Sequence, residues 1–187
     1  MIAEYAAEAE RLGYPHPVVW DALRATGFFY HFMPKMFGGC EFGPEDFFLT
    51  GRQIAEACAS TAWACTFLVE HNWVAALFPE QAQQQFFARG RYFMAPATSV
   101  PFGLMHSDWC IGQALAEVDG KPAMHWMAFP LSGARVLDTW YVQGLCATGS
   151  NDIVVKDLFI PEHMAVRSAD MQFGTTPGAR LHANPMY

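Results

Sequence analysis

The sequence predicts an α+β protein of more than one domain, in which a helical first half precedes a smaller β-rich part. Before about residue 90, apolar side chains recur at three- and four-residue steps, which is typical of helices with one buried face. From Tyr92 onward the apolar period falls to two, which is typical of strands. We therefore expect a helical domain over residues 1–91, a β domain over residues 92–167 and a connecting segment over residues 168–187.

Composition narrows the functional classes. The 187 residues are 52% hydrophobic and 16% charged, which excludes an intrinsically disordered chain. The formal net charge of −7 provides no broad attraction to phosphate backbones, so we expect no nucleic-acid partner. The sequence has no apolar run of about 18 residues and no basic leader, so we expect neither a membrane span nor a signal peptide. Five cysteines without a CxxC pair are typical of reduced thiols in a cytoplasmic protein.

The first helices are bounded by glycine and proline. Val18, Ala22 and Leu23 follow helical spacing, and Gly27 is placed to end that helix. Pro44 stands at the favoured first-turn position of a further helix, which we expect to reach about residue 59.

The next helix, predicted over residues 61–78 with Ser60 as its N-cap, carries the most informative residue of the chain. Four side chains at steps of four, four and three share one face of it, namely Trp63, Phe67, His71 and Val74. Two interpretations of His71 stay open at this point. It is a core histidine bonded to a carbonyl oxygen, or a neutral imidazole that faces an aromatic cofactor or substrate.

The second half of the chain predicts strands. We expect one strand over residues 109–118, after which Asp119-Gly120 indicates a tight hairpin into a second strand over residues 123–129. We expect two further strands, over residues 134–143 and 153–160, and a loop between them over residues 144–151.

Common chemical motifs are absent from the sequence, which has no GxGxxG, GxxxxGK[ST], GxSxG or HExxH. His106, Asp108 and Cys110 alternate and would point the same way from a strand, but no second cluster at ligand spacing accompanies them. We therefore expect no metal site. The default interpretation of Ser99 is a strand-end hydroxyl, and that of residues 148–150 is a turn that caps its own backbone.

Taken together, four stretches resemble the acyl-CoA dehydrogenase superfamily, in particular its flavin-dependent monooxygenases. That branch includes the oxygenase component of p-hydroxyphenylacetate hydroxylase and related aromatic hydroxylases. The similarity runs along nearly the whole chain. The stretches are Pro34-Lys35-Met36-Phe37-Gly38-Gly39; Ala57-Cys58-Ala59-Ser60-Thr61-Ala62-Trp63 with His71-x-Trp73 and Phe78-Pro79; His106-Ser107-Asp108-Trp109; and Thr139-Trp140, Gly144-Leu145 and Thr148-Gly149-Ser150-Asn151-Asp152 with Phe159-Ile160-Pro161.

The resemblance implies a helical N-terminal domain, a small β-barrel-like middle domain and a C-terminal four-helix bundle. This sequence departs from the family pattern at three places. It ends at Tyr187, where the family's connector runs into the bundle, so we expect the bundle to be absent. A hairpin that the family usually carries is missing near Gly103, and Cys146 stands where arginine is common.

The resemblance also implies a site and its partners. The implied cofactor is FMN or FAD, supplied in reduced form by a separate flavin reductase, and the implied substrate is a small aromatic molecule. The full-length protein would form a homo-oligomer. His71 would be the catalytic residue. The flavin contacts would be Ser99, Trp109, Thr148, Gly149 and Ser150, and the substrate pocket would contain Trp63, Phe67 and Trp73.

Three functions remain open at the level of sequence. The first is a fragment of the oxygenase component of a two-component monooxygenase, which hydroxylates an aromatic or polycyclic substrate with reduced flavin and oxygen. The second is a fragment of an acyl-CoA dehydrogenase that oxidises a thioester, against which the His71-x-Trp73 pattern argues mildly. The third is a non-catalytic remnant or interaction subunit, since a chain without the bundle would expose the apolar surface that the bundle covers.

Overall fold

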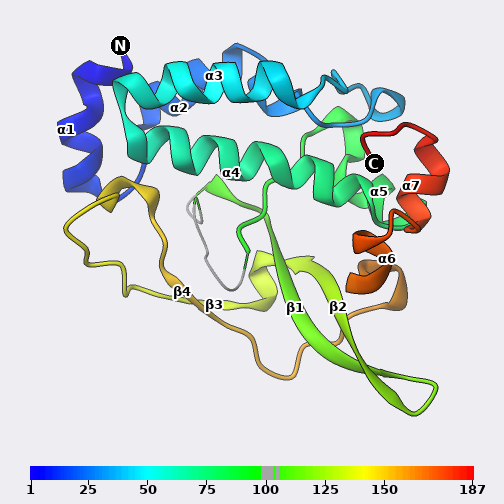
Figure 1. Cartoon of the computed structure of the whole chain (residues 1–187). Coiled ribbons are helices and arrows are strands. Elements are labelled where there is room, and N and C mark those ends of the chain that lie inside the picture. The colour runs from blue at the N-terminus through cyan, green and yellow to red at the C-terminus, as the bar shows by residue number, and fades with distance from the viewer. Residues whose placement is uncertain (98–102, 104–105) are drawn as a thin grey trace.

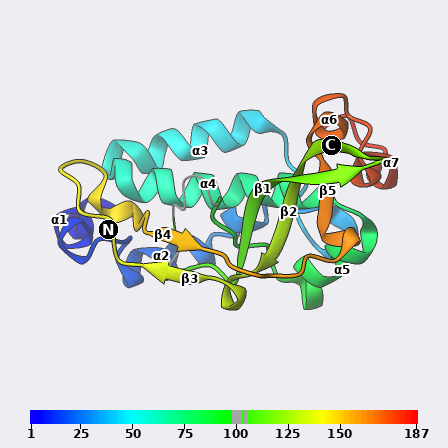
Figure 2. The ribbon, with the colours of Figure 1, turned by 90° about the horizontal axis from the view of Figure 1, so that it is seen from below.

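A helical layer and a small antiparallel β region make up the protein. The computed structural model describes residues 1–97, 103 and 106–187 (Figure 1). Figures 1 and 2 place α3 on one side of α4 and the strands on the other. The elements that precede the strands are α1 (Ile2–Leu12), α2 (Pro17–Ala25), α3 (Pro44–Ala57), α4 (Ala59–Ala76) and α5 (Glu80–Phe86).

Helices α3 and α4 form an antiparallel pair, and a single extended residue separates them in the chain. Pro44 occupies the first turn of α3, as predicted, and the helix ends at Ala57. Cys58 has φ −161° and ψ 110°, which breaks the helix and lets α4 fold back along α3. The predicted N-cap was wrong, because α4 begins at Ala59 and the Ser60 hydroxyl, inside its first turn, donates to the Glu10 carboxylate.

Two aromatic cores hold the layers together. The first lies among α2, α3 and α4, where Trp20, Phe29 and Leu68 are buried. The second joins the helices to the sheet, with Phe78 and Phe93 packed in one cluster with Ile111 of β1. Since each fully buried side chain of this size stabilises the fold by about 1.5–3 kcal/mol, the second core fixes the sheet against α4 and α5.

The predicted hairpin is present. Strands β1 (Trp109–Val118) and β2 (Lys121–Pro130) pair antiparallel from Trp109↔Pro130 to Val118↔Lys121, with Asp119 and Gly120 at positive φ in the turn. β5 (Ala165–Arg167) extends this sheet in the order β1-β2-β5. The half of the hairpin near the turn extends away from the body, and the facing pair Leu115 and Met124 is exposed (Figure 1).

The two remaining strands are much shorter than predicted. β3 (Arg135–Leu137) pairs with β4 (Asp152–Val154) in a separate two-stranded sheet. Beyond Leu137 the Asn151 side chain accepts from the N–H groups of Thr139 and Trp140, at 3.0 and 3.1 Å. These side-chain bonds take the place of ladder bonds, so the predicted strands over 134–143 and 153–160 do not extend through the loop.

The segment after β5 forms two short helices, α6 (Ser168–Gln172) and α7 (Pro177–His182), that fold back on the helical layer. The Gly178 N–H donates to the Leu77 carbonyl at 3.1 Å, and the Tyr187 hydroxyl donates to the Phe32 carbonyl at 3.0 Å. Polar bonds and a small apolar cluster of Ala76, Leu77 and Tyr187 together hold this tail. Among the described residues, no helix has the length and apolar character that crossing a membrane requires.

Candidate functional site

His71 lies on α4 at the interface with the segment that leads into β1. Its side chain is 4% exposed, and its Nδ1 lies within hydrogen-bond distance of the Ala95 carbonyl. Because a carbonyl oxygen only accepts, Nδ1 carries the proton and Nε2 carries the lone pair. Burial lowers the pKa of His71 to about 4, although the Ala95 contact acts in the opposite direction, so the ring is neutral at pH 7. The Phe67 ring meets it edge-on at 4.6 Å between ring centroids.

Asn72, the next residue, fastens the same segment to α4. It is fully buried, and its Oδ1 accepts from the Phe93 N–H at 2.7 Å. Its Nδ2 donates to the carbonyls of Leu68 and Val69, so its polar atoms are satisfied. Consecutive side chains of α4 thus hold residues 93 and 95, which positions the imidazole.

Substitution of Asn72 by leucine keeps much of the volume and removes the acceptor for the Phe93 amide. We expect the free energy of unfolding, measured by urea denaturation, to fall by about 2 kcal/mol, the usual cost of a buried unpaired amide. Gln84→Leu is the control, because Gln84 is exposed and its side chain donates to the Glu80 carboxylate at 3.2 Å. Equal losses in the two variants would contradict the role assigned to Asn72.

The loop that contains Thr148, Gly149 and Ser150 is buried against the end of α1. The Thr148 hydroxyl donates to the Leu145 carbonyl at 2.9 Å and lies 2.8 Å from the Ser150 hydroxyl. Gly149 has φ +63°, and a Cβ there would lie 3.3 Å from the Gly13 carbonyl oxygen. The predicted self-capping turn is therefore present, and its backbone conformation at position 149 favours glycine.

One described glycine connects this loop to α4. The Gly103 N–H donates to the Thr148 carbonyl at 2.9 Å, and a Cβ on Gly103 would lie 2.5 Å from Leu68 Cδ1. Since Leu68 is one turn from His71, the structure brings the 148–150 loop to the same stretch of α4 as the imidazole.

The other predicted site residues have different positions. Trp109 is half-buried at the start of β1 and packs on Phe86 and Phe93, at centroid distances of 5.1 and 6.0 Å. Trp63 and Trp73 are 46% and 37% exposed and line cavities on the side of α4 that faces α3. Ser99 lies outside the described residues.

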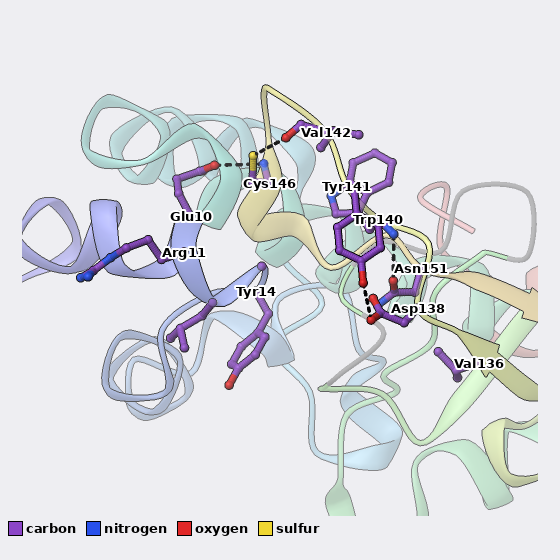
Figure 3. Close-up of a pocket in the computed structure, with 12 residues that line it drawn as sticks. Glu10, Arg11, Tyr14, Val136, Asp138, Trp140, Tyr141, Val142, Cys146 and Asn151 are labelled. Carbon is purple, nitrogen blue, oxygen red and sulfur yellow. Dashed lines mark hydrogen bonds between the residues drawn. The ribbon is translucent and has the colours of Figure 1, made fainter.

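A cavity of about 690 Å³ lies beside the 148–150 loop, between the end of α1 and the β3–β4 connection (Figure 3). Its lining includes residues that sequence reasoning did not assign to a site, namely Glu10, Tyr14, Asp138, Trp140, Tyr141 and Asn151. Trp140 and Asn151 belonged to the stretches that carried the resemblance, so the signal for this region was available. Tyr14 and Glu10 gave no local signal, because they reach the cavity from α1 and the turn after it.

Glu10 connects three segments at this cavity. Burial alone would raise the pKa of its carboxyl group, but hydrogen bonds with Ser60 and Cys146 outweigh burial and lower it. The Cys146 N–H donates to Glu10 at 3.0 Å, and its thiol donates to the Val142 carbonyl at 2.9 Å (Figure 3). The carboxylate therefore anchors the loop on α1 and α4.

His106, Asp108 and Cys110, which alternate in the sequence and were considered as metal ligands, make separate contacts. Asp108 pairs with Arg91 at 2.7 Å, the His106 ring stacks on Trp20 at 4.1 Å between centroids, and Cys110 is buried. Burial also lowers the pKa of His106 to about 4. Within the described ranges no group of three or more histidine, cysteine, aspartate or glutamate side chains is placed to hold a metal ion.

Comparison with known proteins adds to this geometry. Residues 1–89 match the family model described as the N-terminal domain of acyl-CoA dehydrogenases. The chain is 32% identical over 208 aligned residues to HsaA, the oxygenase subunit of a flavin-dependent monooxygenase from Rhodococcus jostii, covering 100% of this chain and 54% of HsaA. It is 29% identical to the oxygenase component of p-hydroxyphenylacetate 3-hydroxylase from Acinetobacter baumannii, covering 97% of this chain and 48% of that protein.

The fold of this chain also matches that of a solved structure. The crystal structure of 3-HSA hydroxylase from Rhodococcus sp. RHA1 matches with a TM-score of 0.94 and 30% identity, over 100% of this chain and 54% of that one. The chain therefore spans about half the length of the relatives it matches.

Proposed function

We propose that this chain, which belongs to the acyl-CoA dehydrogenase superfamily, forms part of the oxygenase component of a two-component flavin-dependent monooxygenase. The substrate would be an aromatic or polycyclic molecule. The flavin, FMN or FAD, would arrive in reduced form from a separate reductase, and when bound it would supply the activation of oxygen. The similarity to oxygenase subunits along the whole chain supports this proposal over a thioester dehydrogenase.

The observation that carries the proposal is the neutral imidazole of His71. With a pKa of about 4, it is a weak base at neutral pH, so its contribution is to accept a hydrogen bond through Nε2 rather than to hold a proton. A phenolic hydroxyl is a donor of that kind. Nδ1 is held by Ala95, which fixes the direction in which Nε2 points. His71 would thereby orient the substrate.

The described residues fit a flat aromatic cofactor on one side. Half-buried Phe67 and the His71 edge would provide an apolar and hydrogen-bonding wall, and the nearby 148–150 loop is buried. Ser99 and Trp109 stay in the proposal as flavin contacts, with Trp109 held in place by Phe86. A site that must exclude water needs a second wall, which we assign to the part of the relatives that lies beyond this chain.

The test is an anaerobic titration of the chain with reduced FMN and reduced FAD, followed by mixing with oxygen and p-hydroxyphenylacetate. We expect either flavin to bind and hydroxylated product to form in low yield, because a site without its second wall admits water. His71→Asn should lower the hydroxylation rate by about 100-fold, because the substrate loses its orienting acceptor. His163→Asn is the control, since His163 is remote in sequence and its Nε2 hydrogen-bonds with the exposed Gln85 side chain.

Three outcomes would contradict the proposal in distinguishable ways. Failure of both flavins to bind would favour a non-catalytic or interaction role for this chain. Flavin-dependent oxidation of a thioester without hydroxylation would favour the dehydrogenase function. Equal rates in His71→Asn and His163→Asn would leave the monooxygenase reaction standing and remove His71 from the site.

A further inference from the structure

A groove runs along the open face between α3 and α4, away from His71. Two cavities of about 680 and 380 Å³ form it, and both are lined by Phe47, Phe48 and Glu70. Trp73 lines the larger cavity and Trp63 the smaller one. We refer to these five residues and the space between them as the α3–α4 groove. Cavities of this size accommodate small organic molecules.

Glu70 is the unusual group in the α3–α4 groove. Its side chain is half-buried, and burial raises the pKa of its carboxyl group, with no opposing contribution from a nearby cation. Within the described part of the chain its carboxylate makes no hydrogen bond and no ion pair. The basic side chain that lines the smaller cavity, Arg52, pairs instead with Glu56 at 3.6 Å. The carboxylate thus pays a desolvation cost without compensation from this part of the chain.

The aromatic rings around Glu70 are partly open to solvent. Phe48 is 69% exposed, Trp63 is 46% exposed and Trp73 is 37% exposed. The indole N–H of Trp73 donates to the Met186 carbonyl, which fixes the ring so that it presents a surface to the groove. Aromatic faces attract cations as well as apolar groups, so these rings and the carboxylate favour the same class of ligand.

We propose that the α3–α4 groove binds an organic cation, in which a protonated amine is attached to an apolar or aromatic body. Glu70 accepts the ammonium group, and Trp63, Trp73 and Phe48 cover the body. A neutral ligand of the same shape would leave the carboxylate buried and unpaired, so charge rather than size determines selectivity. The proposal needs neither bound flavin nor His71, although it uses Trp63 and Trp73, which the resemblance assigned to a substrate pocket.

The test compares 2-phenylethylamine with its neutral analogue 2-phenylethanol by calorimetric titration at pH 7.5, in the absence of flavin. We expect the amine to bind at least about 10-fold more tightly than the alcohol. Glu70→Gln keeps the shape of the side chain and should reduce this preference to near unity. Glu117→Gln removes an exposed carboxylate on strand β1, which lines neither cavity of the groove, and should leave the preference unchanged.

A second variant keeps the result interpretable if Glu70→Gln changes folding. Trp63→Leu should weaken the amine and the alcohol together, because it removes the surface that both bodies contact, while the preference for the amine persists. Equal affinities of the wild type for the two probes, no binding of the amine, or an equal effect of Glu117→Gln and Glu70→Gln would each overturn the proposal.

Discussion

Substitution of Gly39 by alanine is expected to lower the thermal midpoint by about 6–12 °C. A Cβ on Gly39 would lie 2.0 Å from the Met33 carbonyl oxygen and 2.4 Å from the Met33 carbonyl carbon. These are backbone atoms, so no rotation of a side chain relieves the clash. Overpacking costs about 1–3 kcal/mol, and for a domain of this size each kcal/mol corresponds to about 2–4 °C, so we take the upper end.

The backbone around Gly39 has little freedom to move. Met33 is fully buried, and its carbonyl accepts from the Glu41 N–H at 3.1 Å. The Gly39 N–H donates to the Pro34 carbonyl at 3.1 Å. Displacement of either side of the loop therefore breaks a hydrogen bond. Gly144→Ala is the matched control, since nothing lies within 4 Å of its added Cβ and its φ is not positive. A loss in Gly39→Ala no larger than in Gly144→Ala, measured by calorimetry, would refute the expectation.

The second large effect is a loss of stability in acid that depends on His71. The pKa of this group is 6.5 when the chain is unfolded and about 4 in the folded protein. The unfolded state therefore binds more protons between these values, and the stability that is present above pH 6.5 is lost as the pH falls toward 4. Between pH 7 and pH 5 the expected loss from His71 alone is about 2 kcal/mol.

His71→Asn isolates this contribution. The asparagine Nδ2 can donate to Ala95 much as the imidazole Nδ1 does, but it does not titrate. The free energy of unfolding of the variant, measured by urea denaturation at pH 7 and pH 5, should therefore fall by about 2 kcal/mol less than that of the wild type. His106 has the same low pKa and is present in both proteins, so its contribution cancels. Parallel pH profiles for the two proteins would show that His71 is not buried as a neutral ring.

Local sequence signals predicted the elements whose boundaries are set locally. Pro44 marked the start of α3, and Asp119-Gly120 marked the turn of the β1–β2 hairpin, because each residue restricts its own backbone. β3 and β4 are short because of Asn151, whose side chain competes for backbone donors 11 and 12 positions earlier. Alternation of apolar residues carries no information about such a bond.

The candidate site was predictable only in part, for the same reason. Helical spacing correctly placed Trp63, Phe67 and His71 along α4, yet His71 is buried and Trp63 is exposed. The difference arises from what covers each turn, namely the Ala95 segment over His71 and an open groove over Trp63. Likewise, the bond between Glu10 and Cys146 joins residues 136 positions apart, and periodicity in either segment does not indicate it.

The β1–β2 hairpin has a mechanical consequence that follows from its uneven burial. Its inner residues, such as Ile111, are clamped in the second core, whereas Leu115 and Met124 face each other in solvent. The hairpin therefore resembles a cantilever, in which the free energy needed to open a backbone bond decreases with distance from the fixed end. Opening begins at the turn and proceeds inward, so the backbone hydrogen bonds near the turn break many times for each opening that reaches Ile111.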